Sequence, residues 1–158
     1  MKRFVVVEAD PLLTALYARC ARASLSTRPT RLCSTAPTAV LDEHLVVDAD
    51  VCRDSALLDC ADVLQGSLPF PPAGALRRLA ELAGAHPSAG VAAVPLAASS
   101  GLGGWAVTGA CDRAPLLVPY RPDGDFGAPS LLPSCLHAWC VAGRLLKDWP
   151  GAVEAPLV

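Results

Sequence analysis

The sequence predicts an α/β fold: one doubly wound, five-stranded parallel sheet with helices on both of its faces. Short β-branched runs alternate with helix-like segments about five times along the chain. The strand candidates are continuous apolar runs, which is typical of strands buried on both faces. A length of 158 residues fits one domain. We therefore expect residues 1–150 to form this domain and residues 151–158 to be a C-terminal tail.

In the first half of the chain, residues 3–7 are the first strand candidate and residues 11–24 are the helix that follows. Asp10 can accept hydrogen bonds from the free N–H groups at the start of this helix, and the proline after it suits the first helical position. Residues 31–33 are a weak strand candidate. Residues 44–48, which end in an acidic side chain, are a strong one.

Two helices are expected in the middle of the chain. The spacing of apolar residues predicts a helix over residues 55–64, although residues 56–59 could instead form a strand. Residues 68–72 contain three prolines and form a stiff connector that cannot be a central strand. Residues 73–83 are an amphipathic helix, and Gly84 is a typical helix end.

In the last part of the chain, residues 91–94 begin a buried strand that leads to a glycine-rich turn at residues 99–104. We expect a short helix at residues 105–110 and the last strand at residues 116–118. Ser134 is expected to cap the final helix, which extends almost to the tail.

Charge and hydropathy exclude several classes of function. The net charge is −2 and the pI is near 5.8, so the chain has no basic field that would attract a nucleic acid. The first apolar run is interrupted by Glu8 and is too short for a signal peptide, and no apolar stretch is long enough to span a membrane. We expect a cytoplasmic protein without a membrane partner. Its seven irregularly spaced cysteines are expected to be reduced.

Residues 5–13, Val-Val-Val-Glu-Ala-Asp-Pro-Leu-Leu, resemble the first strand and helix start of a CheY-like receiver domain, the phosphoacceptor module of response regulators. The resemblance implies a flavodoxin-like fold. In receivers, acidic residues at the end of the first strand help to hold Mg²⁺, and an aspartate at the end of the third strand accepts a phosphoryl group. A hydroxyl residue and a lysine contact the phosphoryl oxygens, where charge develops.

The resemblance implies a degenerate metal site in this chain, formed by Glu8, Asp10 and Asp48. Ala9 occupies the position of the second acid, which is a direct metal ligand in receivers. Asp10 is one position further along and also serves as a helix cap. We therefore expect no cofactor, with Mg²⁺ as the ion to consider if the acidic site functions.

The resemblance also implies a phosphoacceptor and two supporting residues. Asp48 is the preferred acceptor because it follows the better strand, and Asp59 is the alternative. Ser99 corresponds to the hydroxyl residue. Arg121, which precedes a proline, stands where receivers have lysine, and its planar guanidinium does not replace an ammonium group atom for atom.

This altered site favours a stand-alone, atypical receiver-like signalling module that acts by protein–protein interaction, without Mg²⁺-dependent phosphorylation and without enzyme activity. The expected partner is a signalling protein, such as a histidine kinase or phosphotransfer protein of a phosphorelay. The last helix is a candidate homodimer or partner surface if Leu136 and Trp139 are exposed. One alternative is a working atypical receiver, phosphorylated on Asp48 or Asp59. Another is a small metal-dependent hydrolase or nuclease that uses strand-end carboxylates.

Two further patterns in the sequence are better explained as parts of the folded structure than as ligand-binding or metal sites. The glycine-rich residues 99–104 lack the lysine of a phosphate-binding loop. Cys135, His137 and Cys140 lie close together in the final helix, but no second ligand pair at zinc spacing exists. We interpret these three as packed or exposed side chains.

Overall fold

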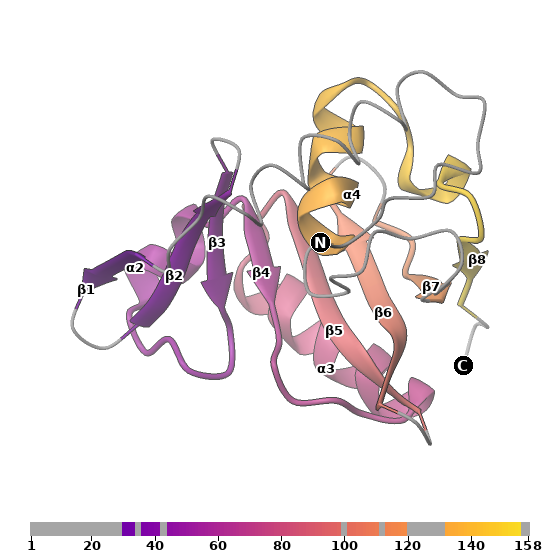
Figure 1. The fold of residues 1–158 in the computed structure, drawn as a ribbon, viewed down its shortest axis with the longest axis horizontal. Helices are drawn as coiled ribbons and strands as arrows, with labels where there is room; N and C mark the ends of the chain where they lie inside the picture. Colours follow the sequence, from indigo (N-terminus) through magenta and orange to yellow (C-terminus); the bar gives the residue numbers. More distant parts are fainter. Residues whose placement is uncertain are drawn as a thin grey trace, which may run out of the picture.

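A computed structural model describes residues 30–33, 36–41, 44–98, 101–110, 113–119 and 132–155. Within these ranges, eight strands form one sheet in which each strand lies beside its sequence neighbours (Figure 1). The strands are β1 (Thr30–Cys33), β2 (Ala36–Leu41), β3 (His44–Asp48), β4 (Val63–Gln65), β5 (Val91–Ala98), β6 (Gly101–Gly109), β7 (Leu116–Pro119) and β8 (Val153–Glu154). The helices are α2 (Ser55–Cys60), α3 (Pro72–Ala85), α4 (Leu132–Val141) and the 3₁₀ turn η2 (Leu146–Asp148).

The expected five-stranded parallel, flavodoxin-like sheet is wrong, because the described sheet is mixed and mostly antiparallel. Only β3–β4 and β4–β5 pair in parallel. The other five neighbouring pairs are antiparallel. Parallel neighbours need a crossover that returns the chain to the same end of the sheet. In this sheet only α2 and α3 provide such crossovers, so the sequential strands on either side of them run antiparallel.

Between β3 and α3, the chain forms a shorter helix than the sequence predicted and an additional strand. The Asp54 side chain accepts hydrogen bonds from the backbone N–H groups of Ala56 and Leu57, and it thereby caps α2. This helix ends at Cys60, short of residue 64, and the alternative strand at residues 56–59 is wrong. Residues 63–65 form β4. This strand lies between β3 and β5, where the side chains of Val63 and Leu64 are completely buried.

A long hairpin of β5 and β6 replaces the short helix expected at residues 105–110, which is therefore wrong. Trp105 and Val107 belong to the core on one face of the sheet, and Ala106 belongs to the core on the other. This alternation suits a strand with both faces covered.

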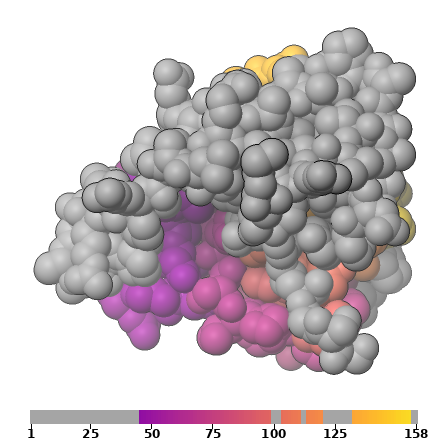
Figure 2. Space-filling model, in the orientation of Figure 1, coloured from indigo at the N-terminus to yellow at the C-terminus, as the bar shows by residue number. Residues whose placement is uncertain are grey.

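The two faces of the sheet carry different helices. In Figure 1, α4 lies over one face of β5 and β6, and α3 lies behind the same strands. Trp139 and Leu136 of α4 pack in the first core, whereas Leu79 and Leu82 of α3 pack in the second. Atoms of α2 and α3 reach the surface along the lower margin of the space-filling view (Figure 2).

The final helical region also differs from expectation. Ser134 lies inside α4, not before it, and the helix ends at Val141. The chain then forms η2, where Trp149 packs edge-on against Trp139 with ring centroids 5.1 Å apart. Val153 and its neighbour, in the expected tail, pair with β7 as β8.

Several local expectations are confirmed. The structure contains the strands expected at residues 31–33, 44–48, 91–94 and 116–118, and the helix expected at residues 73–83.

The strand and helix expected at residues 3–7 and 11–24 lie outside the described residues. The longest described helix has 14 residues, and none in the described ranges combines the length and hydrophobicity needed to cross a bilayer.

Candidate functional site

Asp48 lies at the carboxyl ends of the parallel strands, the edge at which open α/β sheets commonly bind ligands. It ends β3, as the sequence predicted, and lies opposite Gln65 of β4. Its Oδ1 atom accepts hydrogen bonds from the backbone N–H of Asp50 at 2.9 Å and from the Ser67 hydroxyl at 3.2 Å. This carboxylate therefore helps to shape the turn after β3.

The neighbouring Asp50 is more fully engaged. Its Oδ2 atom accepts hydrogen bonds from the backbone N–H groups of Ser67 at 2.7 Å and Leu68 at 3.0 Å, and its Oδ1 atom pairs with Arg78 of α3 at 3.3 Å. Burial alone would raise the pKa of Asp50, but these donors and the guanidinium favour the charged form and lower it below its ordinary value. Asp50 thus joins the turn after β3 to the β4–α3 loop and to α3.

Asp59, the alternative phosphoacceptor, lies in α2 and not at a strand end. Its Oδ1 atom is 2.7 Å from Nδ1 of His86, and its backbone carbonyl accepts a hydrogen bond from the Ser88 hydroxyl at 2.6 Å. These two contacts connect α2 to the loop between α3 and β5. We call them the Asp59 latch.

The other predicted site residues lie outside the described part of the chain: Glu8, Asp10, Ser99 and Arg121. Of the residues predicted for the metal site and the phosphoryl contacts, the described part of the chain contains Asp48 and Asp59.

Among the residues that the structure describes, no three His, Cys, Asp or Glu side chains form a group that could hold a metal ion. Cys135 and His137 are buried in α4, and Cys140 is partly buried. All three side chains belong to one helix, α4.

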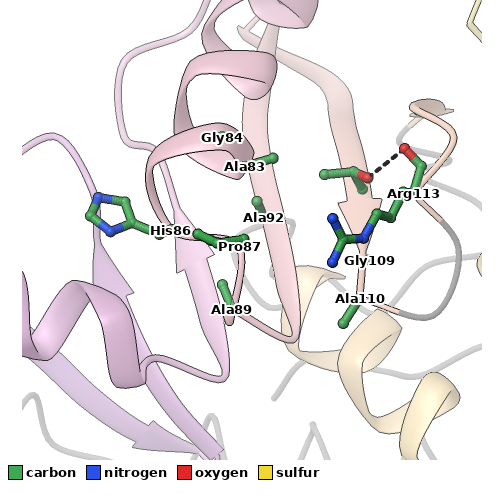
Figure 3. Close-up of a pocket in the computed structure, with 10 residues that line it drawn as sticks. Ala83, Gly84, His86, Pro87, Ala89, Ala92, Gly109, Ala110 and Arg113 are labelled. Atoms are coloured by element: carbon green, nitrogen blue, oxygen red, sulfur yellow. Dashed lines mark hydrogen bonds between the residues drawn. The ribbon is translucent and has the colours of Figure 1, made fainter.

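A pocket lies near the opposite edge of the parallel strands, close to the start of β5. Its volume is about 260 Å³, and it opens between the end of α3, the α3–β5 loop and the end of β6 (Figure 3). Small side chains form most of its wall, and Thr108 and Arg113 contribute polar groups. The lining residues are Ala83, Gly84, His86, Pro87, Ala89, Ala92, Thr108, Gly109, Ala110 and Arg113.

Arg113 supplies the charge of this pocket. Figure 3 shows its guanidinium extending from the β6–β7 side toward Ala92 and Pro87. The Thr108 hydroxyl donates a hydrogen bond of 3.0 Å to the Arg113 carbonyl and so fixes the backbone from which the side chain extends. The structure records no hydrogen bond or ion pair from this guanidinium to any residue that it describes.

Reasoning from the sequence missed this pocket. Its residues come from three separate segments, and alanine and glycine carry no local signal for binding. Arg113 is one of 13 basic residues, and nothing in its neighbours marks it as directed into a cavity. Only the pairing of β5 with β6 places Ala92 opposite Thr108.

Comparisons with protein-family models, curated proteins and solved structures give no significant match to this chain.

Proposed function

We propose that this protein is a binding module for a small carboxylate-bearing molecule, which occupies the pocket beside Arg113. The observation that carries the proposal is the guanidinium itself. Arg113 is exposed to solvent, its side chain lines a cavity of small side chains, and its guanidinium pairs with no described carboxylate. A guanidinium presents parallel N–H donors that match the two oxygens of a carboxylate, so a carboxylate is the natural counterion for this site.

The size of the pocket limits the ligand. A volume of about 260 Å³ is below the roughly 300–1,000 Å³ typical of sites for drug-sized molecules. The methyl groups of Ala89 and Ala92 offer only shallow apolar contacts. These features support a ligand with few non-hydrogen atoms over a nucleotide or a peptide.

The proposal replaces the receiver-like signalling interpretation as the better-supported function. That interpretation depended on residues 5–13, which lie outside the described residues, and on a fully parallel sheet, whereas the described sheet is mixed and mostly antiparallel. Asp48 keeps the strand-end position of a phosphoacceptor. Asp50 beside it is already compensated by Arg78 and by backbone donors.

Binding can be tested by titrating ¹⁵N-labelled protein with propionate while recording amide chemical shifts. We expect the largest shifts at Thr108, Ala110 and Arg113. Arg113→Gln should weaken binding about tenfold or more, because a charge-assisted hydrogen bond contributes about 1.5–3 kcal/mol. Arg53→Gln is the matched control, because it removes an equal charge from an exposed position at the opposite edge of the parallel strands. It should change the affinity less than twofold.

Two results would overturn the proposal. One is the absence of saturable, localised shifts in the wild-type protein. The other is equal affinity of the wild type and Arg113→Gln, which would mean that propionate binds without the pocket guanidinium.

A further inference from the structure

Two adjacent backbone N–H groups and a guanidinium meet one carboxylate at the carboxyl ends of the parallel strands. The N–H groups of Ser67 and Leu68 donate hydrogen bonds of 2.7 Å and 3.0 Å to Oδ2 of Asp50. The Arg78 guanidinium donates one of 3.3 Å to Oδ1 of the same carboxylate. Adjacent backbone N–H groups and a guanidinium are donors that proteins commonly use to bind anions. We call these three groups the Asp50 donor site.

The rest of the fold also holds these donors in place. On one side of the two N–H groups, the Gly66 N–H donates a hydrogen bond of 2.9 Å to the Ala93 carbonyl of β5. On the other side, the Phe70 N–H donates one of 3.0 Å to the Pro95 carbonyl of the same strand. The guanidinium extends from α3, a helix of 14 residues. Donors that are already in position lose little conformational entropy when an anion binds.

The space in front of the donors fits a carboxylate closely. A Cβ atom added at Gly66 would lie 3.3 Å from Oδ2 of Asp50, which is closer than ordinary van der Waals contact. Glycine at this position therefore lets the carboxylate approach the backbone. Burial raises the pKa of Asp50, but the backbone N–H groups and Arg78 lower it, and the net result is a pKa below the ordinary value. The site thus favours a negative charge.

Solvent reaches the margin of the site, although Asp50 fills it. Ser67 and Leu68 are exposed, and Arg78 is partly exposed. Because Asp50 belongs to the same chain, its carboxylate is always present at a high effective concentration. An external anion therefore competes with it poorly.

We infer that the Asp50 donor site is a second binding site for a small carboxylate, which the side chain of Asp50 occupies as an intramolecular ligand. Asp50 thereby closes this edge of the sheet to carboxylates from solution. The inference is independent of the pocket beside Arg113, because the two sites share no residue.

Shortening the side chain at position 50 should open the site to a carboxylate of matching size. Asp50→Ala removes only the carboxylate, which formate replaces. Asp50→Gly also removes the methylene group, so acetate replaces what is lost. Titration of each ¹⁵N-labelled variant with its matching anion should move the amide signals of Ser67 and Leu68 saturably. The same anions should leave these two signals unchanged in the wild type.

The contribution of the guanidinium can be measured in the Asp50→Ala background. Adding Arg78→Gln should weaken formate binding about fivefold or more, because a charge-assisted hydrogen bond is lost. Adding Arg77→Gln is the matched control, because it removes an equal charge from the neighbouring, exposed position. It should change the affinity less than twofold. Chloride at the same concentrations controls for ionic strength.

Three results would overturn the inference. The first is the absence of saturable shifts at Ser67 and Leu68 in both shortened variants. The second is equal weakening of formate binding by Arg78→Gln and Arg77→Gln, and the third is a chloride titration that produces the same shifts as formate. If a shortened variant is unfolded alone, recovery of its circular dichroism is followed instead, because an anion that binds only the folded state raises the folded fraction. Failure to recover in both variants also overturns the inference.

The same spectra keep this site separate from the proposed function. Shifts at Thr108, Ala110 and Arg113 report on the pocket, and they should occur in the wild type and in the shortened variants alike. Shifts at Ser67 and Leu68 should occur in the shortened variants alone. Either proposal can therefore fail while the other stands.

Discussion

Single carboxylates connect separate elements of this protein, and Asp50 does so most extensively. It accepts hydrogen bonds from the loop after β4 and pairs with Arg78 of α3, while only 10% of its side chain is exposed. Its lowered pKa means that the folded protein binds this proton less tightly than the unfolded chain does. The resulting stabilisation is present above the unfolded pKa, near pH 4, and is lost as pH falls through the lower folded value.

Asp50→Asn should therefore lower the free energy of unfolding at pH 7 by about 1–3 kcal/mol, because an amide weakens the charge-assisted contacts and can direct an N–H group toward existing donors. The loss of stability below pH 4 should also be less steep in the variant. Urea unfolding between pH 2 and pH 7 measures both effects. Asp148→Asn, which changes an exposed carboxylate on η2, should stay within about 0.5 kcal/mol of wild type. A stability at pH 7 equal to wild type would contradict the role assigned to Asp50.

Between elements, the Asp59 latch holds the loop that forms one side of the pocket. His86 is largely buried and bonds to α2 through Asp59, and Ser88 bonds to the backbone of the same residue. Pro87 lies between these two anchored positions and lines the pocket. The shape of the pocket consequently depends on α2, a helix that does not itself line it.

Removing the hydroxyl contact of this latch should loosen the loop without unfolding the protein. In Ser88→Ala, we expect the amide of Ala89 to exchange with solvent about fivefold faster, because its hydrogen bond to the His86 carbonyl lies within the released loop. Propionate should bind about threefold more weakly. Hydrogen exchange by NMR measures the first effect, with Ser55→Ala in α2 as the control. Unchanged exchange at Ala89 would show that the latch does not hold the loop.

The elements also show how far the sequence could predict this structure. The strand ending at Asp48 and helix α3 were predictable, because an apolar run and an amphipathic period are local patterns. Strand β4 has three residues, and its identity depends on pairing with β3 and β5. Residues 101–104 of β6 were assigned to a glycine-rich turn and the rest of the strand to a helix, because no local pattern shows that Trp105 lies opposite Pro95. The pocket combines Pro87 with Arg113, and that proximity likewise arises only from strand pairing.

At the scale of the whole molecule, the sheet places a pair of acidic side chains and the pocket at opposite ends of its parallel strands. The Asp48 and Asp50 carboxylates lie at the carboxyl ends of the parallel strands, whereas the pocket lies near the start of β5. Arg78 is already paired with Asp50, and the exposed Arg53 at the same edge makes no contact with Asp48 or Asp50 among those that the structure describes. Phosphoryl transfer to Asp48 would need a further cation to offset charge on the phosphoryl oxygens.

We therefore expect no phosphoryl adduct after incubation with acetyl phosphate and Mg²⁺, as measured by intact mass spectrometry. A receiver domain known to react with acetyl phosphate serves as the positive control. Circular dichroism of the same sample should show that the protein is folded. An adduct that appears in the wild type and disappears in Asp48→Asn would contradict this expectation and restore the atypical receiver as a candidate.

The sequential order of the strands has a consequence for how this chain reaches its native state. Every described strand pairs only with its sequence neighbours: β1 and β8, at the two edges, with one each, and the six strands between them with two each. A chain emerging from the ribosome can therefore add strands to one growing edge without waiting for a distant segment. Closing short loops costs less chain entropy than closing long ones, and proteins with such local connectivity tend to fold quickly. The strand order thus favours assembly during synthesis, with each new strand covering the edge left exposed by the last.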